Sequence, residues 1–128
     1  MTNREDIRSF LDRLELPVEN LAEDIWLVRT TEGAELVVSY APPVLVLRVR
    51  VMPLPSDPAR AGKLCRQLLE YNARELVLGS YGVEGDNVVL TDAMELENLD
   101  FSEFEASVDS LSLALASHLS ALAPYREG

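Results

Sequence analysis

Apolar residues at helical spacing mark the first part of the chain. Ile7, Phe10, Leu11 and Leu14 recur at intervals of three and four residues, which places them on one face of a helix. The sequence Thr2-Asn3-Arg4-Glu5 fits a capping box, and Pro17 interrupts the pattern. The spacing therefore predicts an amphipathic helix that ends near Leu16.

Residues 25–52 change to the alternation expected of strands. Ile25–Thr30 is rich in β-branched and aromatic residues, and Thr31-Glu32-Gly33 supplies a turn. Two further strands are separated by Ala41-Pro42-Pro43. Their inward positions are Leu36, Val38, Tyr40, Leu45, Leu47, Val49 and Val51. Arg48 and Arg50 alternate with these positions, so we expect an antiparallel meander with one buried face and one partly wet face.

A second helix is predicted after the proline-rich segment that ends at Pro58. Asp57 is suited to the N-cap and Pro58 to the first helical position. The apolar stripe consists of Ala61, Leu64, Cys65, Leu68 and Leu69, and the basic side chains are Arg60, Lys63, Arg66 and Arg74. The pattern is typical of an amphipathic helix with a basic outer face.

The C-terminal part predicts a hairpin followed by a long helix. Leu76–Val83 and Val88–Thr91 flank a turn at residues 84–87, and the second strand can continue to Leu96. Gly79 and Gly82 indicate a bulge or a close backbone approach. Ser102-Glu103-Phe104-Glu105 fits a capping box for a helix that ends at Pro124. Its apolar stripe consists of Phe104, Val108, Leu111, Leu115 and Leu122.

The predicted order is α-β-β-β-α-β-β-α. This order belongs to the α+β class, with helices packed on a five-stranded, mainly antiparallel sheet. At 128 residues with 48% hydrophobic residues, the chain is long enough for one core, so we expect a single domain over residues 1–128.

Charge narrows the range of partners. The formal net charge is −11, and residues 75–125 contain no Lys or Arg. Such a field repels phosphate backbones and anionic membrane surfaces, so neither nucleic acid nor membrane is an expected partner. The chain begins without an apolar signal segment, and its one cysteine, Cys65, has no partner for an intramolecular disulfide. These features favour a cytoplasmic location.

Residues that could carry chemistry are few. His118 is the one histidine and lies on the apolar stripe of the last helix, where an imidazole at the core edge or an interface is the favoured interpretation. Cys65 lies among leucines, as an ordinary buried thiol does. The densest acidic cluster is Asp92, Glu95, Glu97 and Asp100. Its spacing fits no calcium-binding loop, which favours a solvated loop over a metal or small-ligand sensor at residues 92–100. No catalytic residue, metal site or cofactor is predicted.

Two leucines of the last helix, Leu113 and Leu119, lie off its main stripe. An apolar surface wider than one core contact requires indicates contact with another chain. The acidic charge has two interpretations: it serves solubility alone, or it meets complementary charge on a partner or on a second copy of the chain. The basic face of the second predicted helix is one such complement within a homodimer.

Several segments resemble a known family. They are Leu68-Leu69-Glu70-Tyr71-Asn72, Leu78-Gly79-Ser80-Tyr81, Gly85, Val88-Val89-Leu90 and Leu96-Glu97-Asn98-Leu99-Asp100. Together with the helix that follows, they look like the YbjN family and, equally, the class I chaperones of type III secretion (the Tir chaperone group). The resemblance implies a homodimer formed through the second helix and the following strand, and no enzymatic activity. It also implies binding of an unfolded protein segment along apolar patches and exposed sheet.

The function expected from the sequence is therefore a non-enzymatic, dimeric module that binds a segment of an unknown protein partner. It would act as a YbjN-like adaptor or chaperone-like regulator, and a dedicated type III secretion effector chaperone is the alternative. The candidate contact residues are Leu64, Leu68, Tyr71, Leu76, Leu78, Ser80, Leu113 and Leu119.

Overall fold

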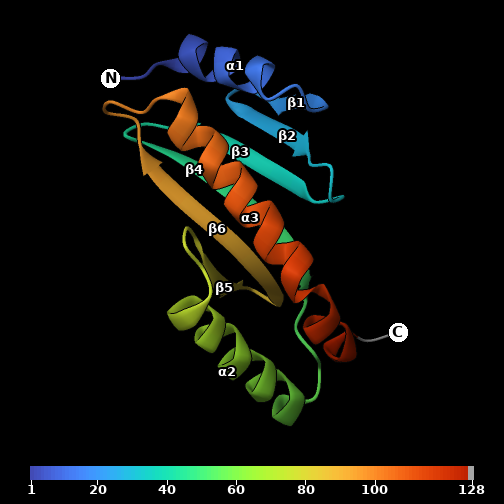
Figure 1. The fold of residues 1–128 in the computed structure, drawn as a ribbon. Helices are drawn as coiled ribbons and strands as arrows, with labels where there is room; N and C mark the ends of the chain where they lie inside the picture. Colours follow the sequence, from blue (N-terminus) through green and yellow to red (C-terminus); the bar gives the residue numbers. More distant parts are fainter. Residues whose placement is uncertain (127–128) are drawn as a thin grey trace.

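The computed structural model describes residues 1–126 and shows helices packed on an antiparallel sheet (Figure 1). The elements are α1 (Arg4–Arg13), β1 (Val18–Ala22), β2 (Ile25–Arg29), β3 (Glu35–Ala41), β4 (Val44–Pro53), α2 (Pro58–Arg74), β5 (Ser80–Glu84), β6 (Asn87–Glu95), α3 (Phe101–Leu122) and the 3₁₀ turn η1 (Ala123–Tyr125). The predicted α+β class is confirmed, and the sheet has six strands within the described residues.

The strands are arranged in the order β1-β2-β3-β4-β6-β5, and neighbours are antiparallel. β1 and β5 are therefore the edge strands. The sequence pattern missed β1 because all five of its residues are exposed, so it has no alternation of buried and exposed positions. β1 is held by its pairing with β2, from Val18 opposite Val28 to Ala22 opposite Ile25.

The central strand β4 carries a bulge that changes which residues enter the core. Leu45, Leu47 and Val49 are buried as predicted, but the register with β6 shifts between Arg50 and Met52. Met52 is consequently 2% exposed, whereas Val51 is only half-buried. A bulge inserts one extra residue and reverses the alternation that follows it.

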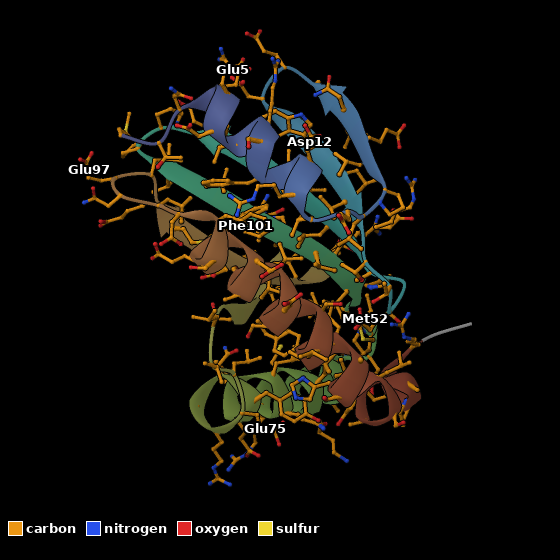
Figure 2. All side chains as sticks on the ribbon, turned by 45° about the horizontal axis from the view of Figure 1, so that its top comes forward. Glu5, Asp12, Met52, Glu75, Glu97 and Phe101 are labelled. Atoms are coloured by element: carbon orange, nitrogen blue, oxygen red, sulfur yellow. The ribbon has the colours of Figure 1, made fainter. Side chains whose placement is uncertain are left out.

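The core lies between the sheet and the helices, with α3 crossing the sheet and α2 lying beside β5 (Figure 1). At the opposite end, Phe101, the first residue of α3, lies beside α1 (Figure 2). The ring of Phe10 in α1 is 6.0 Å from that of Phe101 and 5.9 Å from that of Phe104. α2 contributes Leu64 and Leu68 to the same core.

The helix caps are partly as predicted. Asp57 caps α2 and Pro58 begins it, as the sequence indicates. The capping boxes of α1 and α3 are real but displaced, because Asn3 and Asp100 are the N-caps instead of Thr2 and Ser102. Thr2 is buried, and its hydroxyl donates to the Leu99 carbonyl at 2.8 Å. It therefore ties the beginning of the chain to the loop before α3.

Among residues 1–126, no helix has both the length and the apolar character needed to cross a membrane.

Candidate protein-interaction surfaces

The last helix has apolar side chains on more than one side. Phe104, Leu111 and Leu122 are buried in the core, whereas Leu113 and Leu119 are 58% and 57% exposed. The two exposed leucines line two separate hollows. They therefore belong to two surfaces on opposite flanks of α3.

The first surface, called here the loop surface, lies where the chain passes from α2 to β5. Its apolar members are Leu76, Val77, Leu113 and Ala114, which line a hollow of about 280 Å³ together with Glu75, Ser110, Ser117 and His118. Val77 is 88% exposed, the highest value among the exposed large apolar residues of the described chain. Residues 76–79, predicted as the beginning of a strand, are irregular, and β5 begins only at Ser80.

Gly79 explains why this segment leaves the strand conformation. Its φ is +78°, and an added Cβ would lie 2.6 Å from Leu111 Cδ2 and 2.8 Å from the Thr91 carbonyl oxygen. Only glycine adopts this backbone conformation without strain while approaching a neighbour so closely. The close backbone approach predicted at Gly79 is therefore confirmed, and it directs the loop past α3.

A polar cluster around the buried His118 underlies the loop surface. The Tyr81 hydroxyl oxygen lies 2.7 Å from His118 Nδ1, and His118 Nε2 lies 2.7 Å from a Glu75 carboxylate oxygen. One neutral tautomer satisfies both contacts: Tyr81 donates to Nδ1, and Nε2–H donates to Glu75. The Tyr71 ring stacks on the imidazole at 3.8 Å, with 4° between the planes. Glu75 is the C-cap residue of α2, so its carboxylate enters the cluster from the end of that helix (Figure 2).

The cluster has a structural character. His118 is 4% exposed, and both of its ring nitrogens are engaged. Burial raises the pKa of the Tyr81 phenol above its ordinary value, with smaller contributions from Tyr71 and Glu75, so Tyr81 stays protonated. The interpretation of His118 as a histidine of the core edge is confirmed.

Asn72 connects α2 with β5 beside this cluster. Its side-chain amide donates to the Tyr81 carbonyl at 3.1 Å, and its amide oxygen accepts from the Tyr81 N–H at 2.7 Å. The side chain thus makes the two hydrogen bonds that a neighbouring strand would make. Asn72 and Tyr81 both belong to segments that carry the family resemblance, and together they attach α2 to β5.

The second surface, called here the groove, lies between the last three turns of α3, the β2–β3 turn and β4. It has a volume of about 480 Å³. The α3 wall carries Leu115, Leu119 and Leu122, and the opposite wall carries Val37 and Val51. Sequence reasoning missed this groove, although a signal was present: no Asp, Glu, Lys or Arg lies between Asp109 and Arg126.

Four charged side chains line the groove: Glu32, Glu35, Arg50 and Arg126. Glu32 accepts from the Ser112 hydroxyl at 2.7 Å and from Thr31 at 2.9 Å. The Ser112 hydroxyl lowers the pKa of Glu32, with a smaller contribution from Thr31. Glu32 therefore stays ionised where the β2–β3 turn touches α3.

The basic face of α2 borders a third hollow of about 360 Å³, which Lys63, Arg66 and Arg74 line together with Tyr71 and Tyr125. Arg66 pairs with Glu70 at 3.2 Å. Opposite charges are therefore mixed on this face.

The acidic loop has structural roles. Asp92 accepts from the Ser107 hydroxyl at 2.6 Å. Asp100 caps α3, and the backbone N–H of Glu103 lowers its pKa. Glu97 extends outward at the end of the loop (Figure 2). Within residues 1–126 no three side chains of the metal-binding types converge on a site.

The candidate contact residues separate into three groups. Leu64 and Leu68 are 0% and 3% exposed and belong to the core. Leu76 and Leu113 line the hollow of the loop surface, Tyr71 lines the hollow beside the basic face of α2, and Leu78 and Ser80 follow Leu76 along the chain. Leu119 lines the groove. Cys65 is half-buried and unpaired, as the one cysteine of the chain must be.

Comparison with solved structures places the fold. SpcU and ExoU form a heterodimeric complex from the type III secretion system of Pseudomonas aeruginosa. A chain of that structure has a TM-score of 0.70 and 21% identity, covering 94% of this chain and 98% of that chain. For YbjN from E. coli the values are 0.68 and 12%, covering 93% of each chain. For the HopA1–SchA chaperone–effector complex they are 0.61 and 16%, covering 98% of this chain and 93% of that chain.

At these identities the likeness shows the fold alone. None of the curated proteins matches the chain in sequence. The family model CesT_Tir_1, however, matches residues 1–127. The resemblance to YbjN and to type III secretion chaperones is confirmed at the level of fold, and the chain belongs to the CesT_Tir_1 family.

Proposed function

We propose that this protein is a cytoplasmic, dimeric, non-enzymatic module that binds a segment of a partner protein. Family membership supports the class, since proteins of this chaperone-like fold are generally not enzymes and bind segments of other proteins. The enclosure of His118 by three hydrogen-bonded or stacked neighbours is in keeping with a structural role for the one histidine.

The observation that carries the dimer is the loop surface. Val77 and Leu113 are 88% and 58% exposed and line the same hollow. Covering exposed aliphatic surface with another protein surface removes it from water and contributes a favourable free energy of about 25 cal/mol per Å². His118 and Tyr81 beneath already have hydrogen-bond partners, so a second copy can cover this apolar rim without leaving them unsatisfied. We assign self-association to this surface.

Light scattering at micromolar concentration tests the assignment. Wild-type protein is expected to have the mass of a dimer, and Val77→Asp the mass of a monomer, because a carboxylate at the centre of the surface would be buried without a partner. Leu21→Asp is the matched control: Leu21 is 50% exposed on β1, at the opposite edge of the sheet from β5. A monomeric wild type, or a dimeric Val77→Asp variant, would contradict the assignment.

The partner segment has two routes of attachment. The edge strands β1 and β5 can accept an added strand, and the groove can accept apolar side chains. A dedicated type III secretion effector chaperone is the second candidate, favoured by the likeness to the HopA1–SchA chaperone–effector complex. Gene neighbourhood separates the candidates: an adjacent secretion effector supports the chaperone, and an adjacent regulatory cluster supports the adaptor.

A further inference from the structure

We propose that the groove binds an amphipathic helix of a partner protein, lying parallel to the last three turns of α3. The inference rests on the proposed function only in taking the chain to be a protein-binding module. It adds the conformation, the direction and the charge pattern of the bound segment.

The α3 wall has the dimensions of a helix-binding groove. Leu115, Leu119 and Leu122 follow one stripe of the helix, and their exposure varies from buried at Leu122 to 57% at Leu119. From Ser112 to Leu122 this stripe extends roughly 15 Å at 1.5 Å per residue, which matches about three turns of a second helix.

The uncharged character of this half of α3 favours an apolar occupant. Residues 110–125 contain no Asp, Glu, Lys or Arg, although the chain as a whole carries a net charge of −11. Surface helices of globular proteins normally carry charged side chains on their outer face, and a helix without them is normally covered. Ala116 and Ser120, both exposed, are small enough to let another helix approach.

The charges at the two ends of the groove determine the direction of the helix. Glu32 lies beside Ser112 at one end, where hydroxyl hydrogen bonds keep it ionised. Arg126 lies beyond Leu122 at the other end and donates to the Val51 carbonyl at 3.4 Å. Glu35 and Arg50 also line the groove, next to the paired residues Leu36 and Val49, and Arg50 donates to the Asn87 side chain at 3.0 Å.

A helix carries about half a positive charge at its N-terminus and half a negative charge at its C-terminus. Its N-terminus therefore fits beside Glu32 and its C-terminus beside Arg126, which is the parallel orientation. Basic side chains in the first turn and acidic side chains in the last turn of the partner helix strengthen the same orientation. Leucine-like side chains at i, i+3, i+4 and i+7 face Leu115 and Leu119.

Synthetic peptides of about 12 residues, acetylated and amidated, test the proposal. The matched peptide carries leucines at helical spacing, lysines in its first turn and glutamates in its last turn. The reversed peptide exchanges the lysines and glutamates, and a third peptide carries a central proline that prevents helix formation. Binding is measured by fluorescence anisotropy, and its location by NMR shifts of the methyl groups of Leu115 and Leu119.

The matched peptide is expected to shift these methyl groups and to bind about fivefold more tightly than the reversed peptide. Leu119→Asp is expected to weaken binding by about tenfold or more, whereas Leu69→Asp, at a residue that is 66% exposed on α2 and lines neither surface, leaves it unchanged. Equal binding of the proline peptide or of the reversed peptide would overturn the proposal, as would full affinity in Leu119→Asp.

Light scattering on the same samples separates this proposal from the proposed function. A wild-type dimer that binds none of the peptides at the groove overturns the groove assignment and leaves the dimer standing. A monomeric wild type that binds the matched peptide at Leu119 overturns the dimer and supports the groove.

Discussion

The two flanks of α3 differ in what surrounds equally exposed leucines. Leu113 and Leu119 are 58% and 57% exposed on the same helix. Leu113 lies beside the loop at residues 76–79, where Gly79 closely approaches Leu111 of α3. The hydrogen-bonded side chains of Tyr81, His118 and Glu75 lie beneath this loop. Leu119 stands over a groove that has a carboxylate at one end and a guanidinium at the other.

The comparison teaches that exposure alone does not identify an interface. At the loop surface Tyr81, His118 and Glu75 are hydrogen-bonded to one another, which leaves an apolar rim that suits a copy of the same chain. At the groove the charges are separated along the wall, which suits a partner with a direction. Changes that affect one flank and leave the other intact are therefore the sharpest tests.

The largest effect is expected from Gly79→Ala. The new methyl group would lie 2.6 Å from Leu111 Cδ2 and 2.8 Å from a backbone oxygen, at a φ of +78°. Backbone strain and overpacking together are expected to lower the free energy of unfolding by about 2–4 kcal/mol, measured by urea denaturation. The dimer should weaken as well, because the loop surface moves with Gly79.

Gly82→Ala is the control for this prediction. Gly82 lies three residues away in β5, and no atom lies within 4 Å of its added Cβ. Its substitution should change stability by less than about 1 kcal/mol. A similar loss of unfolding free energy in both variants would contradict the prediction. It would show that the hairpin needs flexible glycines at both positions, and that the close contact at Gly79 has no particular effect.

His118→Phe is expected to have the next largest effect. It removes the acceptor of the buried Tyr81 hydroxyl and the donor to Glu75. Leaving a buried donor unpaired costs about 1–3 kcal/mol, so the midpoint of urea unfolding should fall. Affinity for the matched peptide at the groove should stay at the wild-type value.

A double-mutant cycle isolates the contact between the two side chains. Adding Tyr81→Phe to His118→Phe removes the unpaired hydroxyl, so the double variant should recover part of the lost stability. If the losses of the two single variants simply add, the hydroxyl has no energetic link to the imidazole, and the loop surface does not depend on this cluster.

The extent of prediction from the sequence differs between these features for physical reasons. Local periodicity correctly indicates the buried face of α1, Leu64 and Leu68 in α2, and β4 as far as Val49. It fails at Leu69, which is 66% exposed, and at Val51, which follows the bulge. The Asp57-Pro58 pair specifies the beginning of α2 because Asp57 caps the helix and Pro58 suits its first position. Strand β1 has no buried residue and depends on its partner strand. The caps of α1 and α3 were misplaced by one and two residues, because Thr2 is used in a distant contact with Leu99 and Asp100 precedes Ser102 as the acceptor.

The surfaces required the tertiary structure. Tyr71 and Glu75 come from the end of α2, Tyr81 from β5 and His118 from α3, and no short-range spacing connects these three elements. Leu113 and Leu119 were correctly expected to lie off the main stripe, but only the fold assigns them to different hollows.

Glu32→Gln is expected to have the smallest effect and to act on the groove. Hydroxyl hydrogen bonds, first from Ser112, hold the pKa of Glu32 below its ordinary value of 4.5. A carboxyl whose pKa is lower in the folded state stabilises the fold above about pH 4.5, and this contribution is lost as the pH falls through the folded pKa. The wild type should therefore be slightly more stable than Glu32→Gln at neutral pH, and the difference should vanish on acidification.

Urea unfolding from neutral pH to pH 3 measures this difference, with Glu97→Gln on the outward loop as the control that should show none. The same substitution removes the negative end of the groove, so the advantage of the matched over the reversed peptide should diminish while the dimer mass stays unchanged. A change in dimer mass in Glu32→Gln would mean that the two flanks of α3 are coupled. The distinction between a surface for self-association and a groove for a partner helix would then fail.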